Sequence, residues 1–384
     1  MSNLGTRYTK LKNDTHKSII RRLLKKPSAV VALCIISLTC IVSIFAYVIV
    51  PDKTPSANNM IIELGAKQPG FTTLLLRIPK ANTPQRHCRL FEWFNGTPSV
   101  FNAIPINGYR YEGNRIVVRH YIDDGIEDTL TYTAAQLLPA DELRASTIDQ
   151  QQYITTHNIT KRTFYLGTDR FSRDILSRLI IGSRVTLSVG LVAVLLSLTI
   201  GIILGSLAGY YGGWVDNAVM WVINILYAIP TLLLVFAITL TIGKGFWEIF
   251  IAIGLSMWVG AARLIRGQVM AIKEQEYVTA ARALGIGDAR IIFRHILPNI
   301  AGPVMVVAAG NFAAAILIEA GLSFLGFGVQ PPAPSWGLMI KEHYNFLLTN
   351  RPLLALIPGI AIMLLVYAFN ILGNALRDLL DVKG

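Results

Sequence analysis

The sequence predicts an α-helical polytopic membrane protein with six transmembrane helices and a β-rich domain inserted between helices 1 and 2, and three observations support this. Of the 384 residues, 53% are hydrophobic and only 15% are charged, whereas about 25% of residues in soluble domains are charged. Five stretches lack Asp, Glu, Lys and Arg over the roughly 20 residues that a bilayer core requires. Residues 51–163 are polar and too numerous for a simple connection between helices.

The apolar stretches set the helix boundaries. Because unpaired backbone groups are costly in hydrocarbon, long apolar segments are stable there as helices or closed barrels, and their continuous apolarity favours helices. The first helix covers residues 27–50. A sixth stretch, Gly245 to Ala262, carries a single charge, Glu248, near its start. The other helices are expected at about residues 185–210, 217–242, 246–263, 299–320 and 353–375.

The charge distribution predicts the orientation in the bilayer. The net charge is +12, and much of the excess lies in residues 1–26, directly before the first helix. The loop 264–298 is also basic, and counting crossings from a cytoplasmic N-terminus places it on the same side. Short cytoplasmic loops carry such an excess of Lys and Arg. We therefore expect both termini in the cytoplasm, and we expect the lipid bilayer, and no nucleic acid, as the partner of these charges.

Residues 51–163 are expected to form a small folded domain outside the membrane. Runs such as TTLLLRI, RIVVRHYI and DTLTYTA are rich in the β-branched and aromatic residues that strands favour. Residue pairs typical of tight turns separate these runs. The pairs are Asn107-Gly108, Gly113-Asn114 and Asp124-Gly125.

Residues 168–184 combine charged and apolar side chains just before the second predicted helix. Phe171, Ile175 and Leu179 fall on one helical face, and Thr168 is suited to cap the N-terminus. This pattern predicts a separate helix that lies along the outer membrane surface. A polar extension of the following helix is the alternative interpretation.

Two features inside the predicted helices concern packing. Gly201, Gly205 and Gly209 recur at every fourth position, so one helix face allows another backbone to come close. Glu319 follows an uncharged stretch and is a candidate for an outer gate or for a polar pair at a helix interface. We assign no residue as a substrate contact.

The cytoplasmic loop contains the run EYVTAARALGIGDARIIFRHILPN, from Glu276 to Asn299. Tyr277, Ala280, Ala281 and Leu284 share one face of a short helix, which ends at the glycines that follow. A helix of about a dozen residues is marginal alone in water. We therefore expect this helix to dock against another surface.

This loop resembles the coupling loop of ABC-importer permeases, whose general pattern is Glu-Ala-Ala, three residues, Gly, nine residues, Ile, one residue, Leu-Pro. Thr279 replaces the Glu of the pattern and His295 replaces the Ile, as in the oligopeptide and dipeptide branch of the family. The residues in register are Ala280, Ala281, Gly285, Leu297 and Pro298.

The resemblance extends over roughly residues 164–381 and follows the order of motifs in the C-type subunit of that branch. It leaves the enlarged segment 51–163 without a counterpart. The matching runs are LGTDRFSRDILSRLIIGSRVTLSVG, AGYYGGWVD, WVGAARLIRGQ, EAGLSFLGFGVQPPAPSWG and FNILGNALRDLLD.

The resemblance implies a permease core at residues 164–384 in a bacterial inner membrane, which imports di- or oligopeptides. It also implies a second homologous permease subunit, two ATP-binding-cassette ATPase subunits that hold ATP-Mg, and an extracytoplasmic substrate-binding protein. By the same resemblance, the chain binds no cofactor or metal, is not an enzyme, and couples to the ATPase through one set of residues. This set is Glu276, Tyr277, Thr279, Ala280, Ala281, Arg282, Ala283, Leu284, Gly285, His295, Leu297 and Pro298.

Other functional classes fit the sequence less well. No GxxxxGK[ST] motif occurs, so the chain lacks the phosphate-binding loop of a self-powered pump. An ion-coupled secondary transporter would more often carry ionisable residues within its helices and broken helices at repeated positions. A permease-fold scaffold, or an exporter-like subunit with a specialised extracytoplasmic domain, remains the main alternative.

Overall fold

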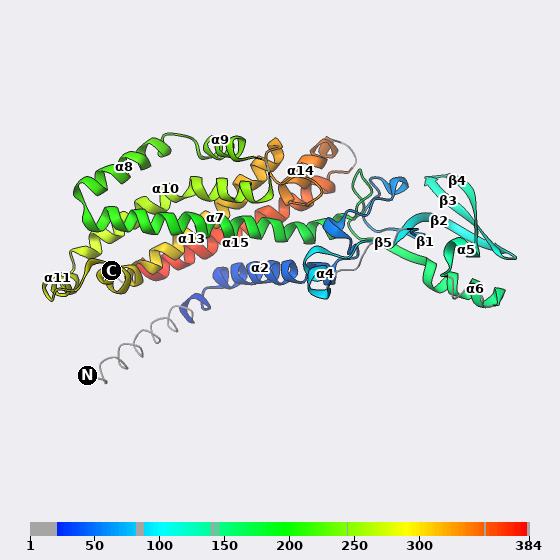
Figure 1. The fold of residues 1–384 in the computed structure, drawn as a ribbon, viewed down its shortest axis with the longest axis horizontal. Coiled ribbons are helices and arrows are strands. Elements are labelled where there is room, and N and C mark those ends of the chain that lie inside the picture. Colours follow the sequence, from blue (N-terminus) through cyan, green and yellow to red (C-terminus); the bar gives the residue numbers. More distant parts are fainter. Residues whose placement is uncertain are drawn as a thin grey trace, which may run out of the picture.

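The computed structural model describes residues 21–81, 88–139, 143, 146–243, 245–348 and 351–381. Most of the predicted cytoplasmic segment 1–26 therefore lies outside the described residues. The molecule is elongated, with a bundle of long helices at one end and a β-sheet at the other (Figure 1). The chain first runs along the bundle toward the sheet and later returns through the bundle by another long helix (Figure 1).

Five helices in the described part of the chain are long and apolar enough to cross a membrane. The first, Pro27–Ile44 (α2), is followed directly by the short helix Ala46–Ile49 (α3). The other four are Ile175–Tyr211 (α7), Phe246–Lys273 (α10), Leu297–Leu325 (α13) and Leu353–Asp381 (α15).

The prediction of one continuous helix over residues 217–242 is wrong. The structure has two helices there, Gly213–Tyr227 (α8) and Thr231–Ile242 (α9), which meet at a bend of 94°. Pro230 stands at the break with an extended backbone, and a proline has no N–H to continue the helical hydrogen bonds. The pair forms either a broken span or a re-entrant loop.

The separate surface helix predicted for residues 168–184 is also wrong. Residues 168–174 are not helical, and α7 begins at Ile175 and continues for 37 residues. Its N-terminus is capped by Asp174, whose carboxylate accepts a hydrogen bond of 3.0 Å from the Ser177 N–H. The Thr168 hydroxyl instead donates to the carbonyl of Leu64. The polar extension of the second helix is therefore the interpretation that holds, from residue 175 onward.

Helices α7 and α10 pack closely along the glycine-bearing face of α7. A Cβ added at Gly201 would lie 2.8 Å from the Ala261 Cβ. One added at Gly205 would lie 2.6 Å from the Ala262 carbonyl oxygen, and one at Gly209 would lie 2.7 Å from that of Arg266. Because real Cβ atoms do not come so near, each glycine position excludes a larger residue.

The loop 264–298 is mostly helical. Helix α10 extends to Lys273, ten residues beyond the predicted end at 263. The helices Glu276–Ala283 (α11) and Asp288–Ile291 (α12) follow, and the π-helical turn Ile292–Ile296 (η5) leads into α13. Gly285, with φ of +75°, lies between α11 and α12, in a conformation that glycine adopts without strain.

Short elements surround the end of the bundle nearest the sheet. Helix α14, at Trp336–His343, packs against α15 and α13. The remaining short elements are Pro55–Ala57 (η1), Ile62–Leu64 (η2), Arg89–Asn95 (α4) and Tyr344–Leu348 (η6).

A five-stranded antiparallel sheet lies between α3 and α7 in the chain, with the order β4-β3-β2-β1-β5 among the described residues. Gly113-Asn114 and Asp124-Gly125 form the turns between β2 and β3 and between β3 and β4, as expected. The strands are Phe71–Pro79 (β1), Phe101–Glu112 (β2), Arg115–Asp123 (β3), Ile126–Thr133 (β4) and Ile159–Phe164 (β5).

The third predicted turn, Asn107-Gly108, lies instead inside β2, where the pairing with β3 shifts register between Ile106 and Gly108. Such a bulge bends a strand without ending it. One face of the sheet packs on apolar residues from the helices Ala134–Leu137 (α5) and Thr147–Tyr153 (α6) and the π-helical turn Ile154–Asn158 (η4). The sheet thus has a hydrophobic core of its own.

Candidate functional site

The end of the bundle farthest from the sheet carries exposed apolar side chains. It is formed by α11, α12 and η5 (Figure 1). Leu284 is 82% exposed, Phe293 71% and Tyr277 46%, and Ala280 is also exposed. We call these four residues the tip surface. Such a group of apolar side chains is costly in water and typical of a surface that binds a protein partner.

The opposite face of α11 fixes it to the bundle. Val278 and Ala281 are buried against α7 and α10 in a cluster that includes Tyr210, Ile265 and Val269. The four residues that the sequence placed on one face of this helix therefore do not all point the same way. Ala281 is buried against the bundle, whereas Tyr277, Ala280 and Leu284 are exposed. A rigidly held helix with an exposed apolar face can transmit a push to the bundle.

The tip is also joined to the end of α7 by polar contacts. The Tyr210 hydroxyl donates a hydrogen bond of 2.6 Å to Asp288 of α12. The Arg282 guanidinium lies 5.4 Å from the centroid of the Tyr210 ring, in the range of a cation–π contact. These contacts connect α11 and α12 to the C-terminal end of α7.

The remaining residues predicted for the coupling loop lie around α11 and at the start of α13. The Thr279 hydroxyl donates to the Glu276 carbonyl within the helix, at 2.8 Å. His295 lies in η5, and its carbonyl accepts a hydrogen bond from the Asn299 side chain. Arg282 and Ala283 are exposed on α11. Leu297 and Pro298 do not end a loop but form the first turn of α13.

Glu319 lies far along α13 from the tip and is fully buried. One carboxylate oxygen accepts a hydrogen bond of 2.6 Å from the Ser323 hydroxyl, one helical turn later. The Ser335 hydroxyl lies 3.4 Å from that of Ser323. The other carboxylate oxygen has no partner among the described residues. The surroundings of Glu319 fit an internal polar cluster between α13 and α14, and whether it gates transport remains a hypothesis.

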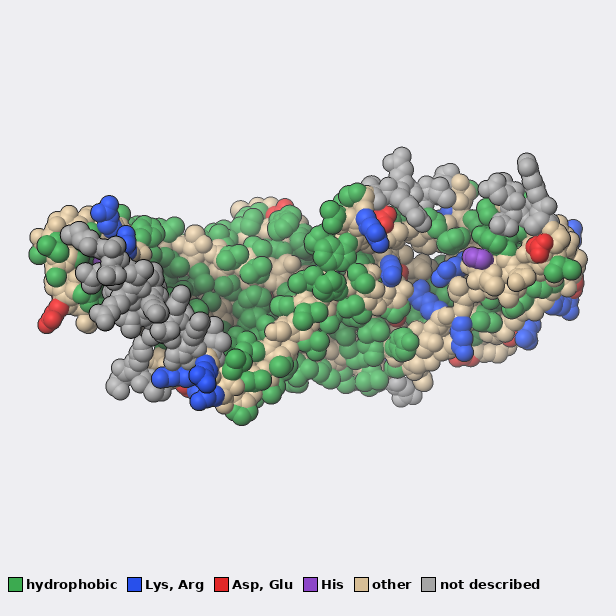
Figure 2. Space-filling view, turned by 90° about the horizontal axis from the view of Figure 1, so that it is seen from below, with side chains coloured by type: hydrophobic (Ala, Val, Ile, Leu, Met, Phe, Trp, Pro, Cys, Tyr) green, Lys and Arg blue, Asp and Glu red, His purple; other side chains and the backbone are tan. Residues whose placement is uncertain are grey.

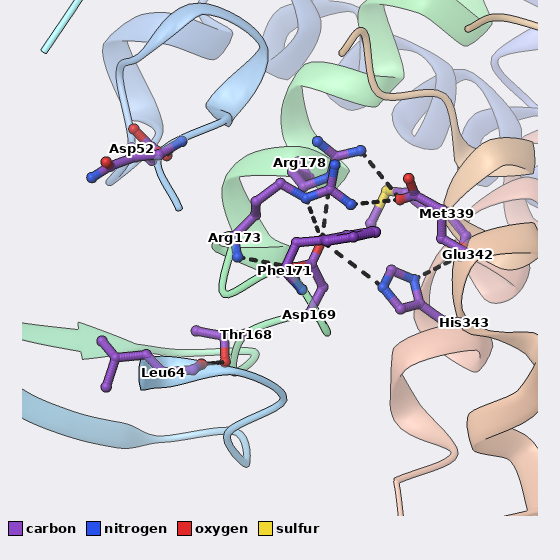
Figure 3. A network of polar contacts seen from close by, with 11 residues as sticks. Asp52, Leu64, Thr168, Asp169, Phe171, Arg173, Arg178, Met339, Glu342 and His343 are labelled. Atoms are coloured by element: carbon purple, nitrogen blue, oxygen red, sulfur yellow. Dashed lines mark hydrogen bonds and ion pairs between the residues drawn. The ribbon is translucent and has the colours of Figure 1, made fainter. Parts of the chain in front are cut away.

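A buried network of charges, which the sequence did not predict, lies at the other end of the bundle (Figure 3). Arg173 binds Asp169 at 2.6 Å and Glu342 of α14 at 2.7 Å. Arg178 lies 3.5 Å from Glu342 and 3.9 Å from Asp169, and His343 lies 3.9 Å from Asp169. The network joins the segment before α7 to α14.

Burial disfavours the charged form of His343 within this network. Its Nδ1 lies 2.7 Å from the Met339 carbonyl and donates to it. Burial lowers the pKa of His343, and the carboxylate of Asp169 opposes this effect. Ligand atoms of Asp169, Glu342 and His343 lie within 4.8 Å of one another. However, the two arginines already neutralise both carboxylates, so this cluster does not suit a metal cation.

A cavity of about 440 Å³ opens at the break between α8 and α9. Thr231 lines it from α9, Ser256 from α10 and Asn311 from α13. None of the described residues that line this cavity is charged. The cavity therefore lies among α8, α9, α10 and α13 and presents hydroxyl and amide groups on otherwise apolar walls.

Comparisons with known proteins identify the family. Residues 201–383 match the family described as binding-protein-dependent transport system inner membrane component. The glutathione transport system permease protein GsiD of Pectobacterium atrosepticum is 41% identical over 219 residues, which are 57% of this chain and 72% of that protein. This chain belongs to the family of binding-protein-dependent transport system inner membrane components.

Two further relatives in this family come from Bacillus subtilis. The dipeptide transport system permease protein DppC is 40% identical over 61% of this chain and 73% of its own length. The oligopeptide transport system permease protein OppC is 40% identical over 57% of this chain and 72% of its own length. A solved structure of the MetNI methionine ABC transporter in an inward-facing conformation matches 53% of this chain and 96% of its own, with 19% identity and a TM-score of 0.44.

Membership in this family assigns the chain to the inner membrane as a transport component. It also accounts for the apolar helices of the bundle, which form a helical permease fold. The matched region begins inside α7 and includes the tip surface. It does not include the sheet of residues 71–164.

Proposed function

We propose that this chain is the permease subunit of an ATP-driven importer of di- or oligopeptides. Its relatives are permease proteins of dipeptide, oligopeptide and glutathione systems. The observation that carries the mechanism is the tip surface, an exposed apolar face on a helix whose other face is buried in the bundle. The chain itself hydrolyses no ATP in this proposal, and two ATPase subunits hold ATP-Mg.

The tip surface would dock into a groove of one ATPase subunit. The contact must differ between the ATP-bound and ATP-free arrangements, because a partner that binds both conformations equally shifts no equilibrium. Closure of the ATPase pair would move α11 and α12. The contact between Tyr210 and Asp288 would then pass this motion to α7.

A second, homologous permease would complete the passage for the peptide. In this proposal, the cavity at the break between α8 and α9 would form this chain's share of the passage. Uncharged hydroxyl and amide groups suit a passage for peptides of differing sequence, because they can bind backbone groups without selecting a side-chain charge. An extracytoplasmic binding protein would deliver the peptide.

In the proposed orientation the tip lies in the cytoplasm with both termini, and the sheet lies outside the membrane as an inserted β-rich domain. The basic loop 264–298 supports this direction. A bundle with the sheet at one end and α11 at the other would expose one end on each side of the membrane (Figure 1).

The sharpest test replaces the most exposed residue of the tip surface. Leu284→Asp places a charge on an 82% exposed position and should leave the bundle intact. We expect ATP-dependent peptide uptake by the reconstituted complex to fall at least about tenfold, as for a central interface residue. Hydrolysis of ATP by the partner subunits should persist without transport.

Leu284→Met is the matched control, because it keeps the volume and apolar character of the side chain. It should transport normally. Ala281→Asp is a poorer test, because Ala281 is buried and a charge there would disturb folding. Normal uptake by Leu284→Asp would contradict the assigned docking surface, and uptake without ATP or partner subunits would contradict the importer itself.

A further inference from the structure

A groove lies where the sheet meets the chain that leaves α3. Its volume is about 500 Å³, and a neighbouring cavity of about 410 Å³ shares four of its lining residues. One wall consists of residues 51–59 and another of residues 97–100, while strands β1, β2 and β5 supply the floor. Together the two cavities are large enough for a small ligand. The shared residues are Thr54, Asn59, Pro98 and Ser99.

Five cations line this groove, and no acidic residue lines it among the described residues. None of the five makes an ion pair with a described carboxylate. By contrast, Arg110 on the same sheet binds Glu112 at 2.9 Å. The cations of the groove are Lys53, Arg77, Lys80, Lys161 and Arg162.

The register of the sheet places two of these cations on the floor. Thr73 lies opposite Arg162, Leu75 lies opposite Thr160, and Arg77 is two residues further along β1. Since alternate residues of a strand share a face, Arg77, Thr160 and Arg162 point to the same side of the sheet. Lys161 lies opposite Leu74, so its side chain points to the other side.

Two polar atoms of the floor lack hydrogen-bond partners among the residues that the structure describes. The Thr160 hydroxyl and the Nε of Arg162 are buried, and neither makes a hydrogen bond among the described residues. Buried polar atoms are normally satisfied. The guanidinium of Arg162 already lies over the Phe164 ring, 5.0 Å from its centroid. Together with the cations that make no ion pair, the unsatisfied Thr160 hydroxyl indicates a site that can receive an acceptor from outside the chain.

We propose that this groove binds a short peptide that carries acidic groups. Arginine binds carboxylates through paired N–H groups, and lysine binds them as a point charge. The cations are spread over two connected cavities rather than gathered at one point, which suits several carboxylates along one chain better than a single anion. The choice of a peptide rests on the proposed function.

The location supports a ligand in solution beside the membrane. Lys53 follows the end of α3 by a few residues, so the groove lies just beyond the helical bundle. Figure 2 shows Lys and Arg side chains where the hydrophobic surface of the bundle gives way to the end that carries the sheet. Concentrated positive charge at such a mouth attracts anionic solutes.

The test measures binding of triglutamate to the full-length chain, in its assembled complex, in nanodiscs of zwitterionic lipid without ATP. We expect triglutamate to bind at least about tenfold more tightly than triglutamine, and the affinity to fall as salt rises. In the double variant Lys53→Gln/Arg77→Gln, the Kd for triglutamate should rise about tenfold, since two charge contacts are lost.

Arg110→Gln/Arg119→Gln is the matched control, because both cations lie on the same sheet with acidic partners of their own. It should bind triglutamate as the wild type does, and both double variants should keep the wild-type thermal unfolding. Equal affinity for triglutamate and triglutamine, or an unchanged Kd in Lys53→Gln/Arg77→Gln, would overturn the proposal.

Two further arms separate the peptide from other anions. Inorganic phosphate should bind at least about tenfold more weakly than triglutamate, because it can reach fewer of the cations; equal affinity would overturn a peptide site. Triglutamate should bind equally well in nanodiscs with anionic lipid, and loss of binding there would assign the groove to lipid headgroups. ATP-dependent uptake of a neutral tripeptide by the groove variant tests the proposed function separately.

Discussion

His343, at the sheet end of the bundle, makes the free energy of unfolding depend on pH. Its Nδ1 donates a hydrogen bond to the Met339 carbonyl, and the ring faces the carboxylate of Asp169 with Arg173 and Glu342 nearby. Burial lowers its pKa below the usual value of 6.5. The folded state therefore binds a proton at His343 less readily than the unfolded chain does. The stabilisation that His343 contributes is therefore fully present above pH 6.5. It is lost as the pH falls from 6.5 toward the lower pKa of the folded state.

The pH dependence of unfolding tests this sign. Between pH 7.5 and 5.5 we expect the Tm of the wild type to fall about 2 °C further than that of His343→Gln, whose amide can still donate to Met339. His157→Gln, at an exposed position, is the matched control and should follow the wild type. If the Tm of the wild type and of His343→Gln fell equally with pH, protonation of His343 would not destabilise the folded state, and the prediction would be wrong.

This network could not be derived from local sequence patterns. Arg173 and Arg178 look like the polar face of a surface helix when only their own segment is considered. Their carboxylate partner Glu342 is more than 160 residues away in the chain. Nothing in helical periodicity reports such a pair. The one local hint is the density of charge directly before a long apolar helix.

At the scale of elements, the glycine face of α7 determines how closely α10 can approach. The sequence predicts this close packing from spacing alone, because residues four apart share a helix face. The partner helix could not be named from the sequence, since any small-residue surface would fit. The structure identifies α10, through Ala261, Ala262 and Arg266.

Gly205→Ala should destabilise the folded chain by about 1–3 kcal/mol, because the new methyl group would press on the backbone of Ala262. Gly267→Ala is the control: a Cβ there meets open space, and alanine is the better helix former by up to about 1 kcal/mol. Thermal unfolding in the same detergent compares the two. A Gly205→Ala chain as stable as Gly267→Ala would show that the helices can separate without cost.

The break between α8 and α9 shows the limit of hydropathy. Residues 217–243 contain no charge, so composition cannot distinguish one span from two short helices. Pro230 indicates a kink, but the angle of 94° depends on how α8 packs on α7 and α10 and how α9 packs on α10 and α13. The cavity at the break was therefore not predictable, although its polar residues were visible in the sequence.

At the scale of the whole molecule, the sequence predicts the order of the membrane-spanning helices. It also predicts a β-rich domain on one side of the membrane and the loop 264–298 on the other. Charge counting requires only the number of crossings, so it does not depend on helix boundaries. The five long helices and the bent pair agree with the predicted order. The orientation itself remains a prediction, and native cysteines offer a direct measurement.

Cys88 is exposed near α4, while Cys34 and Cys40 lie in α2. In spheroplasts that contain the Cys34→Ala/Cys40→Ala chain, a membrane-impermeant maleimide should label Cys88. Adding Leu284→Cys should give a second label only after the membrane is permeabilised. A label at position 284 in intact spheroplasts would reverse the orientation and remove the basis for coupling to cytoplasmic ATP.

The unbroken length of α7 has a mechanical consequence. At 37 residues the helix is about 55 Å long, so it exceeds the roughly 30 Å of hydrocarbon. Arg178 anchors one extremity and Tyr210 the other. A strut of this kind converts a tilt of about 5° into a displacement of about 5 Å at its far extremity. A movement of α7 at the Tyr210 end would thus also displace its Arg178 end, near the opposite membrane surface. Because the helix is continuous, no other contacts are needed to pass the movement on.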